Sequence, residues 1–140
     1  MMTELEQRQQ QVIEEFSVFT DWMDKYEYLI ELGKELEPMP DTDKTDQNII
    51  KGCQSQVWLT ANFADGLVIF RADSDAIITK GIIGLLVKVL SGLPPKEIID
   101  ADLHFIDAIG LRENLSPTRS NGLVSMIKQI KMYALAFSGN

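Results

Sequence analysis

Cys53 is the residue of this chain best suited to covalent chemistry, and it is the only cysteine among the 140 residues. A glycine precedes it and polar residues surround it, in the order Lys51, Gly52, Cys53, Gln54, Ser55, Gln56. Free cysteines are commonly small buried hydrophobic residues, whereas a loop thiol near a lysine and backbone donors can hold thiolate character. The glycine permits an unusual backbone angle or a close approach by another chain. These features leave a reactive and a structural role both open.

The counts of cysteine and histidine exclude several kinds of site. With one cysteine and one histidine, His104, the chain cannot form an internal disulfide, a Cys/His zinc site or a multi-cysteine Fe–S cluster. Nothing around His104 supplies a catalytic triad, so we expect it to be a partly buried structural residue. A thiol without a general base or a resolving cysteine can still exchange with a sulfur delivered by another molecule. A carrier that accepts one sulfur atom and passes it on fits this inventory.

Charge separates the two parts of the chain and excludes one class of partner. The formal net charge is −8, which disfavours nucleic-acid binding because such proteins usually present a basic face. Residues 1–48 hold 13 acidic and 4 basic residues, a net charge of −9. This acidic part is either a solvated helical face or a surface that steers a partner. No signal peptide or membrane-spanning stretch is recognisable, so we expect a cytoplasmic protein with a reduced thiol.

The periodicity of the apolar residues predicts helices on both sides of one hairpin. Thr3 and Glu6 form a capping-box pattern at the start of a first helix, and residues 22–36 are expected to form a second, ended by two prolines. Residues 41–46 (DTDKTD) are interpreted as a solvated linker. Alternating apolar residues and the Asp65-Gly66 pair predict an antiparallel hairpin over residues 54–72.

The second half of the chain is expected to supply the remaining helices. A buried helix is predicted over residues 76–90, capped by Ser74 or Asp75 and packed closely on the sheet through Gly81 and Gly84. A short helix follows over residues 95–99, and a last helix runs from Ser116 to about residue 137. We therefore predict an α+β fold, a single domain over residues 1–140 with a small antiparallel β-sheet packed by helices.

Four segments resemble one family of proteins. They are residues 52–58 (GCQSQVW), residues 22–33 (WMDKYEYLIELG), Ser74-Asp75-Ala76 with Lys80-Gly81, and residues 115–123 (LSPTRSNGL). The first and last of these are long and specific, and together the matches extend from about residue 10 to residue 135. On these residues the chain is similar to the SufE family of sulfur-acceptor proteins.

The resemblance implies a fold shared with the Fe–S scaffold IscU and a role as a carrier and activator rather than an enzyme. The expected partner is a pyridoxal-phosphate-dependent cysteine desulfurase of the SufS type, and the expected recipient is an Fe–S assembly scaffold. The protein would need no cofactor of its own and no metal, and would be a monomer or a weak homodimer. Cys53 would be the nucleophile that becomes a persulfide, with its loop formed by Gly52, Gln54, Ser55 and Gln56. Asp75 and Arg119 match positions linked to placing that loop and to partner response.

Other interpretations stay open beside this one. The partner could be a different desulfurase, as for the CsdE type, or the protein could be a regulatory module in which Cys53 is incidental. From the residues alone, Asp75 could simply cap the central helix, and Arg119 could form an ion pair with Asp75 or Asp73. We further hypothesise that Cys53 rests against apolar side chains near Trp58 and swings out when a partner docks.

Overall fold

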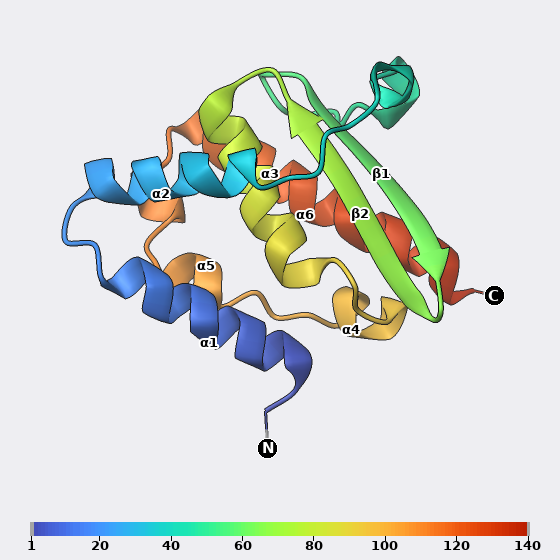
Figure 1. Cartoon of the computed structure of the whole chain (residues 1–140), viewed down its shortest axis with the longest axis horizontal. Coiled ribbons are helices and arrows are strands. Elements are labelled where there is room, and N and C mark those ends of the chain that lie inside the picture. The colour runs from blue at the N-terminus through green and yellow to red at the C-terminus, as the bar shows by residue number, and fades with distance from the viewer. Residues whose placement is uncertain (1, 140) are drawn as a thin grey trace.

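The computed structural model of the protein describes residues 2–139, which form six α-helices and one two-stranded antiparallel sheet (Figure 1). Three single-turn 3₁₀ helices lie in the connections, at residues 41–43, 46–48 and 112–114. The α+β class predicted from the sequence is confirmed. In chain order the elements are α1 (Glu4–Ser17), α2 (Trp22–Lys34), β1 (Val57–Ala64), β2 (Leu67–Ser74), α3 (Ile77–Leu90), α4 (Pro95–Ile99), α5 (Phe105–Ala108) and α6 (Pro117–Ser138).

Local hydrogen bonds explain where several helices begin. The Thr3 hydroxyl accepts the amide of Glu6, as the capping box predicts, and Asp21 and Ser116 cap α2 and α6 in the same way. The predicted cap of α3 is wrong. That helix has Ala76 at its N-cap position and no side-chain cap, because the Asp75 carboxylate accepts a different amide, that of Gln56.

The hairpin follows its predicted turn. Asp65 and Gly66 both have positive φ, 54° and 80°, which matches the strand twist of a two-residue hairpin turn. The register pairs Ala64 with Leu67 at the turn and Val57 with Ser74 at the open end. Residues 54–56, predicted as strand, lie outside the sheet and belong to a loop before β1.

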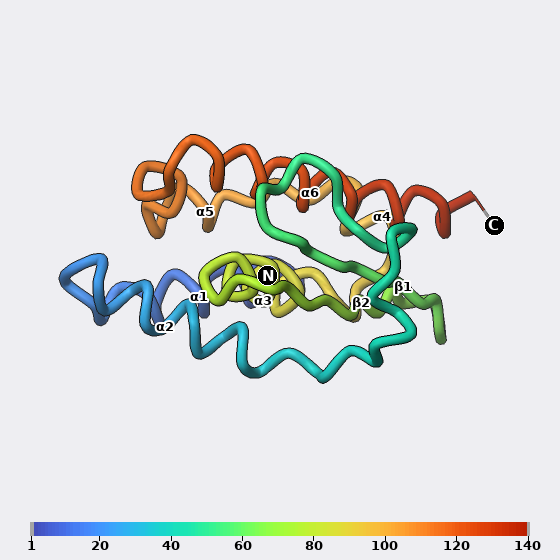
Figure 2. Tube along the Cα trace, turned by 90° about the horizontal axis from the view of Figure 1, so that it is seen from above, coloured from blue at the N-terminus to red at the C-terminus, as the bar shows by residue number. Residues whose placement is uncertain are grey.

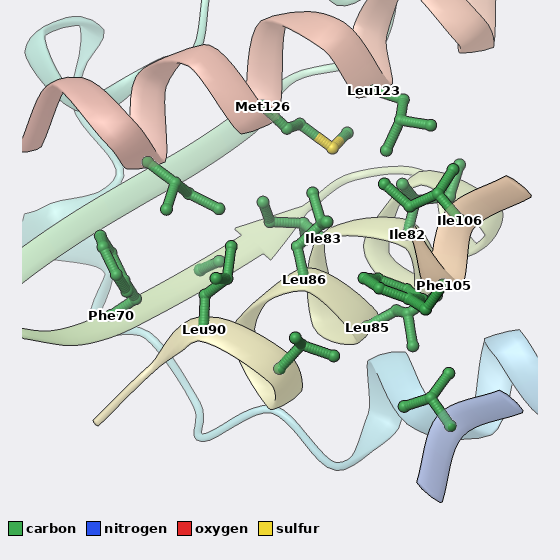
Figure 3. Close-up of a cluster of buried hydrophobic side chains, with 14 of the residues drawn as sticks. Phe70, Ile82, Ile83, Leu85, Leu86, Leu90, Phe105, Ile106, Leu123 and Met126 are labelled. Atoms are coloured by element: carbon green, nitrogen blue, oxygen red, sulfur yellow. The ribbon is translucent and has the colours of Figure 1, made fainter. Parts of the chain in front are cut away.

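The elements form two layers, which Figure 2 shows most clearly: α4, α5 and α6 on one side, and α1, α2, α3 and the hairpin on the other. The core lies between α3, the hairpin and α6, where side chains from α3 meet Leu123 and Met126 of α6 (Figure 3). As predicted, α3 is buried over most of its circumference. The inner face of α6 consists of Leu123, Met126, Ile130 and Ala134. No helix within residues 2–139 is long and apolar enough to cross a membrane.

The close packing predicted for Gly81 and Gly84 occurs against α2 rather than against the sheet. A Cβ atom on Gly81 would stand 2.4 Å from the backbone oxygen of Leu29, and one on Gly84 would stand 3.0 Å from that of Leu32. Gly33 of α2 faces Gly81 with a similar lack of space. Backbone therefore contacts backbone where these helices cross, and no side chain fits between them.

The burial of two polar residues, His104 and Gln9, differs from what the sequence indicated. His104 is exposed and lies 3.4 Å from a Glu6 carboxylate oxygen, so the expectation of a partly buried histidine is wrong. Gln9 of α1 is fully buried instead. Its amide nitrogen donates to the Asp102 carbonyl and its oxygen accepts the Phe105 amide, so it fixes the connection into α5.

Candidate functional site

The cysteine loop, residues 51–56, is held firmly at its base. The Ile50 amide donates to the Val57 carbonyl at 2.8 Å, and Ile49 forms an isolated antiparallel bridge with Trp58. Ile50 and Val57 are both buried, so the two ends of the loop are anchored in the core. The loop therefore leaves the core and returns to it at fixed points.

The last residue of β2 and the residue after it hold the end of the loop, Gln56, through three hydrogen bonds. The Asp75 carboxylate accepts the Gln56 amide at 3.0 Å, and the Asp75 amide donates to the Gln56 carbonyl at 3.2 Å. The Ser74 hydroxyl donates to the same carbonyl at 2.7 Å. Asp75 therefore fixes the backbone three residues beyond Cys53 and does not cap a helix.

The tip of the loop lies on α6, over a surface that we call the cysteine seat, Gly122 and Ser125. Gly52 has φ +96°, and a Cβ atom on it would stand 2.4 Å from the Ser125 hydroxyl oxygen. A Cβ on Gly122 would stand 3.4 Å from the Cys53 sulfur. The unusual backbone angle that the sequence allowed for Gly52 is therefore present, and the close approach is made by this chain's own α6. Figure 2 shows the chain ahead of β1 passing over α6.

A single weak hydrogen bond joins Cys53 itself to the seat. Its thiol donates to the Gly122 carbonyl with the sulfur 3.7 Å from the oxygen. Thiols are weak donors, and the carbonyl belongs to a helix that already uses it. The tip of the loop is thus held more loosely than its base.

The Cys53 side chain is partly buried, and burial raises the pKa of its thiol above the usual value. The thiol is therefore protonated at neutral pH while it occupies the seat. This is opposite to the thiolate character that the neighbouring Lys51 suggested. The thiol is not fully exposed, and Cys53 packs against the hydrophobic core, as the shielding hypothesis requires. The Trp58 ring lies beneath the ammonium of Lys44, 5.7 Å from the centroid, whereas the apolar side chains that line the cavity with Cys53 are Ile82 and Met126.

A cavity of about 80 Å³ opens beside Cys53. Its lining mixes polar loop residues with side chains of α3 and α6: Gln54, Ser55, Thr79, Ile82, Thr118, Arg119, Gly122 and Met126. Arg119 thus lies close to the cysteine loop, as the resemblance led us to expect of its position. Within residues 2–139 it forms no ion pair, so the predicted pairing with Asp75 or Asp73 is wrong.

Asp73 is occupied by two lysines instead. Its carboxylate lies 3.0 Å from the Lys44 ammonium and 3.2 Å from that of Lys80. Burial alone would raise the pKa of Asp73, but the bonds from Lys44, the Ser74 amide and Lys80 outweigh it and lower that pKa. Lys44 comes from the segment interpreted as a solvated linker, which is thus fastened to the sheet next to the loop.

The sequence did not identify Ser125 or Thr79 as neighbours of the cysteine. Ser125 is one helical turn beyond Gly122, a spacing that places both on one face of α6, but only the fold shows that the loop lies there. In the described part of the chain, no three His, Cys, Asp or Glu side chains gather in a way that could hold a metal ion.

Comparison with known proteins assigns the chain to a family. The family model described as "SufE: Fe-S metabolism associated domain" matches residues 10–134, and the chain belongs to this family. A SufE-like protein of Synechocystis is 42% identical over 126 residues, covering 90% of this chain and 79% of that protein. A SufE-like protein of Rhizobium meliloti is 43% identical over 129 residues, covering 89% and 92%.

Two further comparisons differ in what they add. SufE-like protein 1 of Arabidopsis thaliana, described as chloroplastic/mitochondrial, is 41% identical over 133 residues, which cover 94% of this chain but 36% of that longer protein. The solution structure of a hypothetical protein from Thermus thermophilus superposes with a TM-score of 0.78 over 95% of this chain and 97% of that chain. At 21% identity this second likeness supports the fold alone.

Proposed function

We propose that this protein is a sulfur carrier that accepts sulfane sulfur on Cys53 from a pyridoxal-phosphate-dependent cysteine desulfurase of the SufS type. It stimulates the desulfurase by removing the sulfur and passes it to an Fe–S assembly scaffold. One observation carries the proposal. The only cysteine lies at the tip of a loop, where a single weak hydrogen bond holds it, while the base of the loop is anchored in the core. Membership of a family associated with Fe–S metabolism supports it.

The chemistry is one thiol–persulfide exchange. The Cys53 thiolate attacks the terminal sulfur of the donor's persulfide, R–S–SH, forming a new S–S bond as the old one breaks. The donor cysteine leaves as a thiolate, and Cys53 becomes Cys53–S–SH. No electrons are gained or lost overall, so the step requires no oxidant and no cofactor on this chain.

Because the pKa of the seated thiol is raised, the loop must move before Cys53 can react efficiently. Because burial disfavours the thiolate, the seated cysteine is a poor nucleophile. Leaving the seat costs the thiol one weak hydrogen bond and returns it to water, where more of it ionises. The anchored base at Ile50 and Val57 limits this movement to the tip. The resting protein is thereby protected from unwanted alkylation or oxidation, and reactivity appears when the loop is displaced.

Intact-mass spectrometry tests the proposal directly. The protein is incubated with a SufS-type desulfurase and cysteine, beside a Cys53→Ser variant. We expect one added sulfur atom on the wild type, removable by reductant and absent from the variant, together with faster desulfurase turnover. No added sulfur from an active desulfurase would contradict this assignment. Loading by a desulfurase of a second type would instead indicate the paralogous role, and full stimulation by Cys53→Ser would indicate a regulatory module.

A further inference from the structure

The basic side chains without an ion pair are concentrated around the cysteine loop. Within residues 2–139, seven of the 13 Lys and Arg side chains are paired with carboxylates. The other six are Lys25, Lys51, Lys88, Arg119, Lys128 and Lys131. Lys25 lies over the Trp22 ring, and Lys131 donates to the Ala101 carbonyl. Of the remaining four, three border the loop or the helix beneath it, in a protein whose net charge is −8.

These three cations lie along two hollows, one on each side of the loop. Arg119 lines the cavity beside Cys53. On the other side, Lys51 and Lys128 line a groove of about 490 Å³ between residues 46–51 and α6. We call this the cationic groove; its other lining residues are Asp46, Gln47, Asn48, Ile49, Ile50, Ser125, Gln129, Met132 and Tyr133.

The cationic groove has the composition of a protein-binding surface. Lys51 and Lys128 are exposed, and Asp46 is the only acidic residue in the lining. Met132 adds an apolar side chain that is 53% exposed. Apolar surface beside unneutralised cations fits a segment that carries both carboxylates and apolar side chains.

We infer that the cationic groove, with Arg119 across the loop, is the docking surface for an acidic segment of the protein that delivers sulfur to Cys53. This inference rests on the proposed function. It commits to one face of the molecule, because α6 lies in the layer opposite α1 and α2, which hold seven of the 21 acidic residues (Figure 2). The acidic helices therefore face away from the docked donor in this arrangement.

The position of the groove connects docking to the cysteine. Ser125 lines the groove and also lies beneath Gly52, while Lys51 adjoins Gly52 in the chain. A segment bound in the groove therefore contacts the support of the loop tip. Binding and displacement of Cys53 from its seat are consequently linked through these two residues.

Charge reversal with a matched control tests the surface. Lys128→Glu places a carboxylate in the groove, and Lys88→Glu makes the same change on α3, at an exposed lysine that also lacks an ion pair. Both positions are exposed, so both variants should fold. We expect Lys128→Glu to weaken binding to the desulfurase about tenfold, since an attraction becomes a repulsion, and Lys88→Glu to change it less than about twofold. Wild-type affinity should fall as salt is raised.

Two further readouts separate failure of this inference from failure of the proposed function. Loading of Cys53 by glutathione persulfide bypasses docking and should be equal in wild type and Lys128→Glu. A zero-length carbodiimide cross-linker should join Lys51 or Lys128 to aspartate or glutamate residues of the desulfurase. If the wild type is loaded by the desulfurase but Lys128→Glu binds like Lys88→Glu, or cross-links arise only from α1 and α2, the docking surface is wrong. If no desulfurase loads the wild type, the proposed function is wrong, and this inference fails with it.

Discussion

The crossing of α2 and α3 and the contact of the cysteine loop with α6 use the same device, a glycine where any side chain would collide. At the helix crossing, Gly81 meets the backbone and side chain of Leu29, which is fully buried. At the seat, Gly52 meets the hydroxyl of Ser125, and Cys53 meets Gly122 through one weak hydrogen bond beside a small cavity. One contact belongs to the core, whereas the other is the contact that we propose opens when a partner docks.

The difference shows that a close approach alone does not make a contact rigid. Separating α2 from α3 would expose apolar side chains, at about 25 cal/mol for each Å². Releasing the tip of the loop breaks one thiol hydrogen bond and exposes little further apolar surface, because Gly52, Gln54 and Gln56 are already exposed. The four predictions that follow test this contrast.

The largest effect is expected from Gly81→Ala. Its Cβ would stand 2.4 Å from a backbone oxygen, so the helices must move apart. We expect a loss of about 3 kcal/mol in the free energy of unfolding, which corresponds to a melting temperature lower by roughly 10 °C. Circular dichroism would measure it, with Gly122→Ala as the control. That Cβ makes only an ordinary contact at 3.4 Å, so its effect should stay within about 1 kcal/mol. Equal losses would contradict the contrast.

Gly52→Ala should act on the loop and less on the whole fold. A side chain at φ +96° is strained by about 1–2 kcal/mol even without the contact to Ser125. We expect alkylation of Cys53 by iodoacetamide to become roughly tenfold faster, because the strain favours the displaced loop. The single cysteine makes intact mass an unambiguous readout. In the double variant with Ser125→Ala, the collision between the new Cβ and the Ser125 hydroxyl is removed. Alkylation should then slow only partly toward the wild-type rate. A full return to that rate would show that the positive φ of residue 52 does not contribute to the strain.

Asp75→Ala tests the firmly held side of the loop. The Gln56 amide loses its carboxylate acceptor, which is worth about 1 kcal/mol, so hydrogen exchange at that amide should accelerate roughly fivefold. Asp75→Asn keeps an acceptor oxygen and should exchange nearly as slowly as the wild type. If alanine and asparagine behave alike, the carboxylate is not what holds Gln56.

The pH dependence of Cys53 alkylation should show the smallest effect, a shift of one titration. Because burial raises the pKa of the thiol, the folded protein holds its proton to higher pH than the unfolded chain. The stabilisation from seating is present in full below the unfolded pKa and is lost as pH rises through the folded one. Alkylation in buffer should thus have a higher midpoint than in urea. A lower midpoint in buffer would mean that the seat favours the thiolate.

Features governed by neighbours in the chain could be predicted from the sequence. Asp65 and Gly66 predicted their turn because the residue types themselves tolerate positive φ. Thr3 and Ser116 predicted helix starts because a cap bonds three residues ahead. The run of apolar residues over 76–90 predicted a buried helix, because a helix that is apolar on nearly all sides must lie inside the domain. The family resemblance, carried by contiguous segments such as residues 52–58, is local information of the same kind.

Features that depend on which distant segments meet were decided by the tertiary structure. Gly81 was recognisable as a close-packing residue, but its partner is α2 and not the sheet. For Asp75 and Arg119 the residues alone left a helix cap and an ion pair open beside a place near the cysteine loop. In the structure Asp75 holds Gln56, and Arg119 lines the cavity beside Cys53. The sequence also located the loop that carries Cys53, but it did not show that this loop lies on Gly122 and Ser125 of α6. Residue type and spacing determine what a side chain can do, whereas its partner depends on contacts between distant parts of the chain, such as that of Cys53 with Gly122, 69 residues further on.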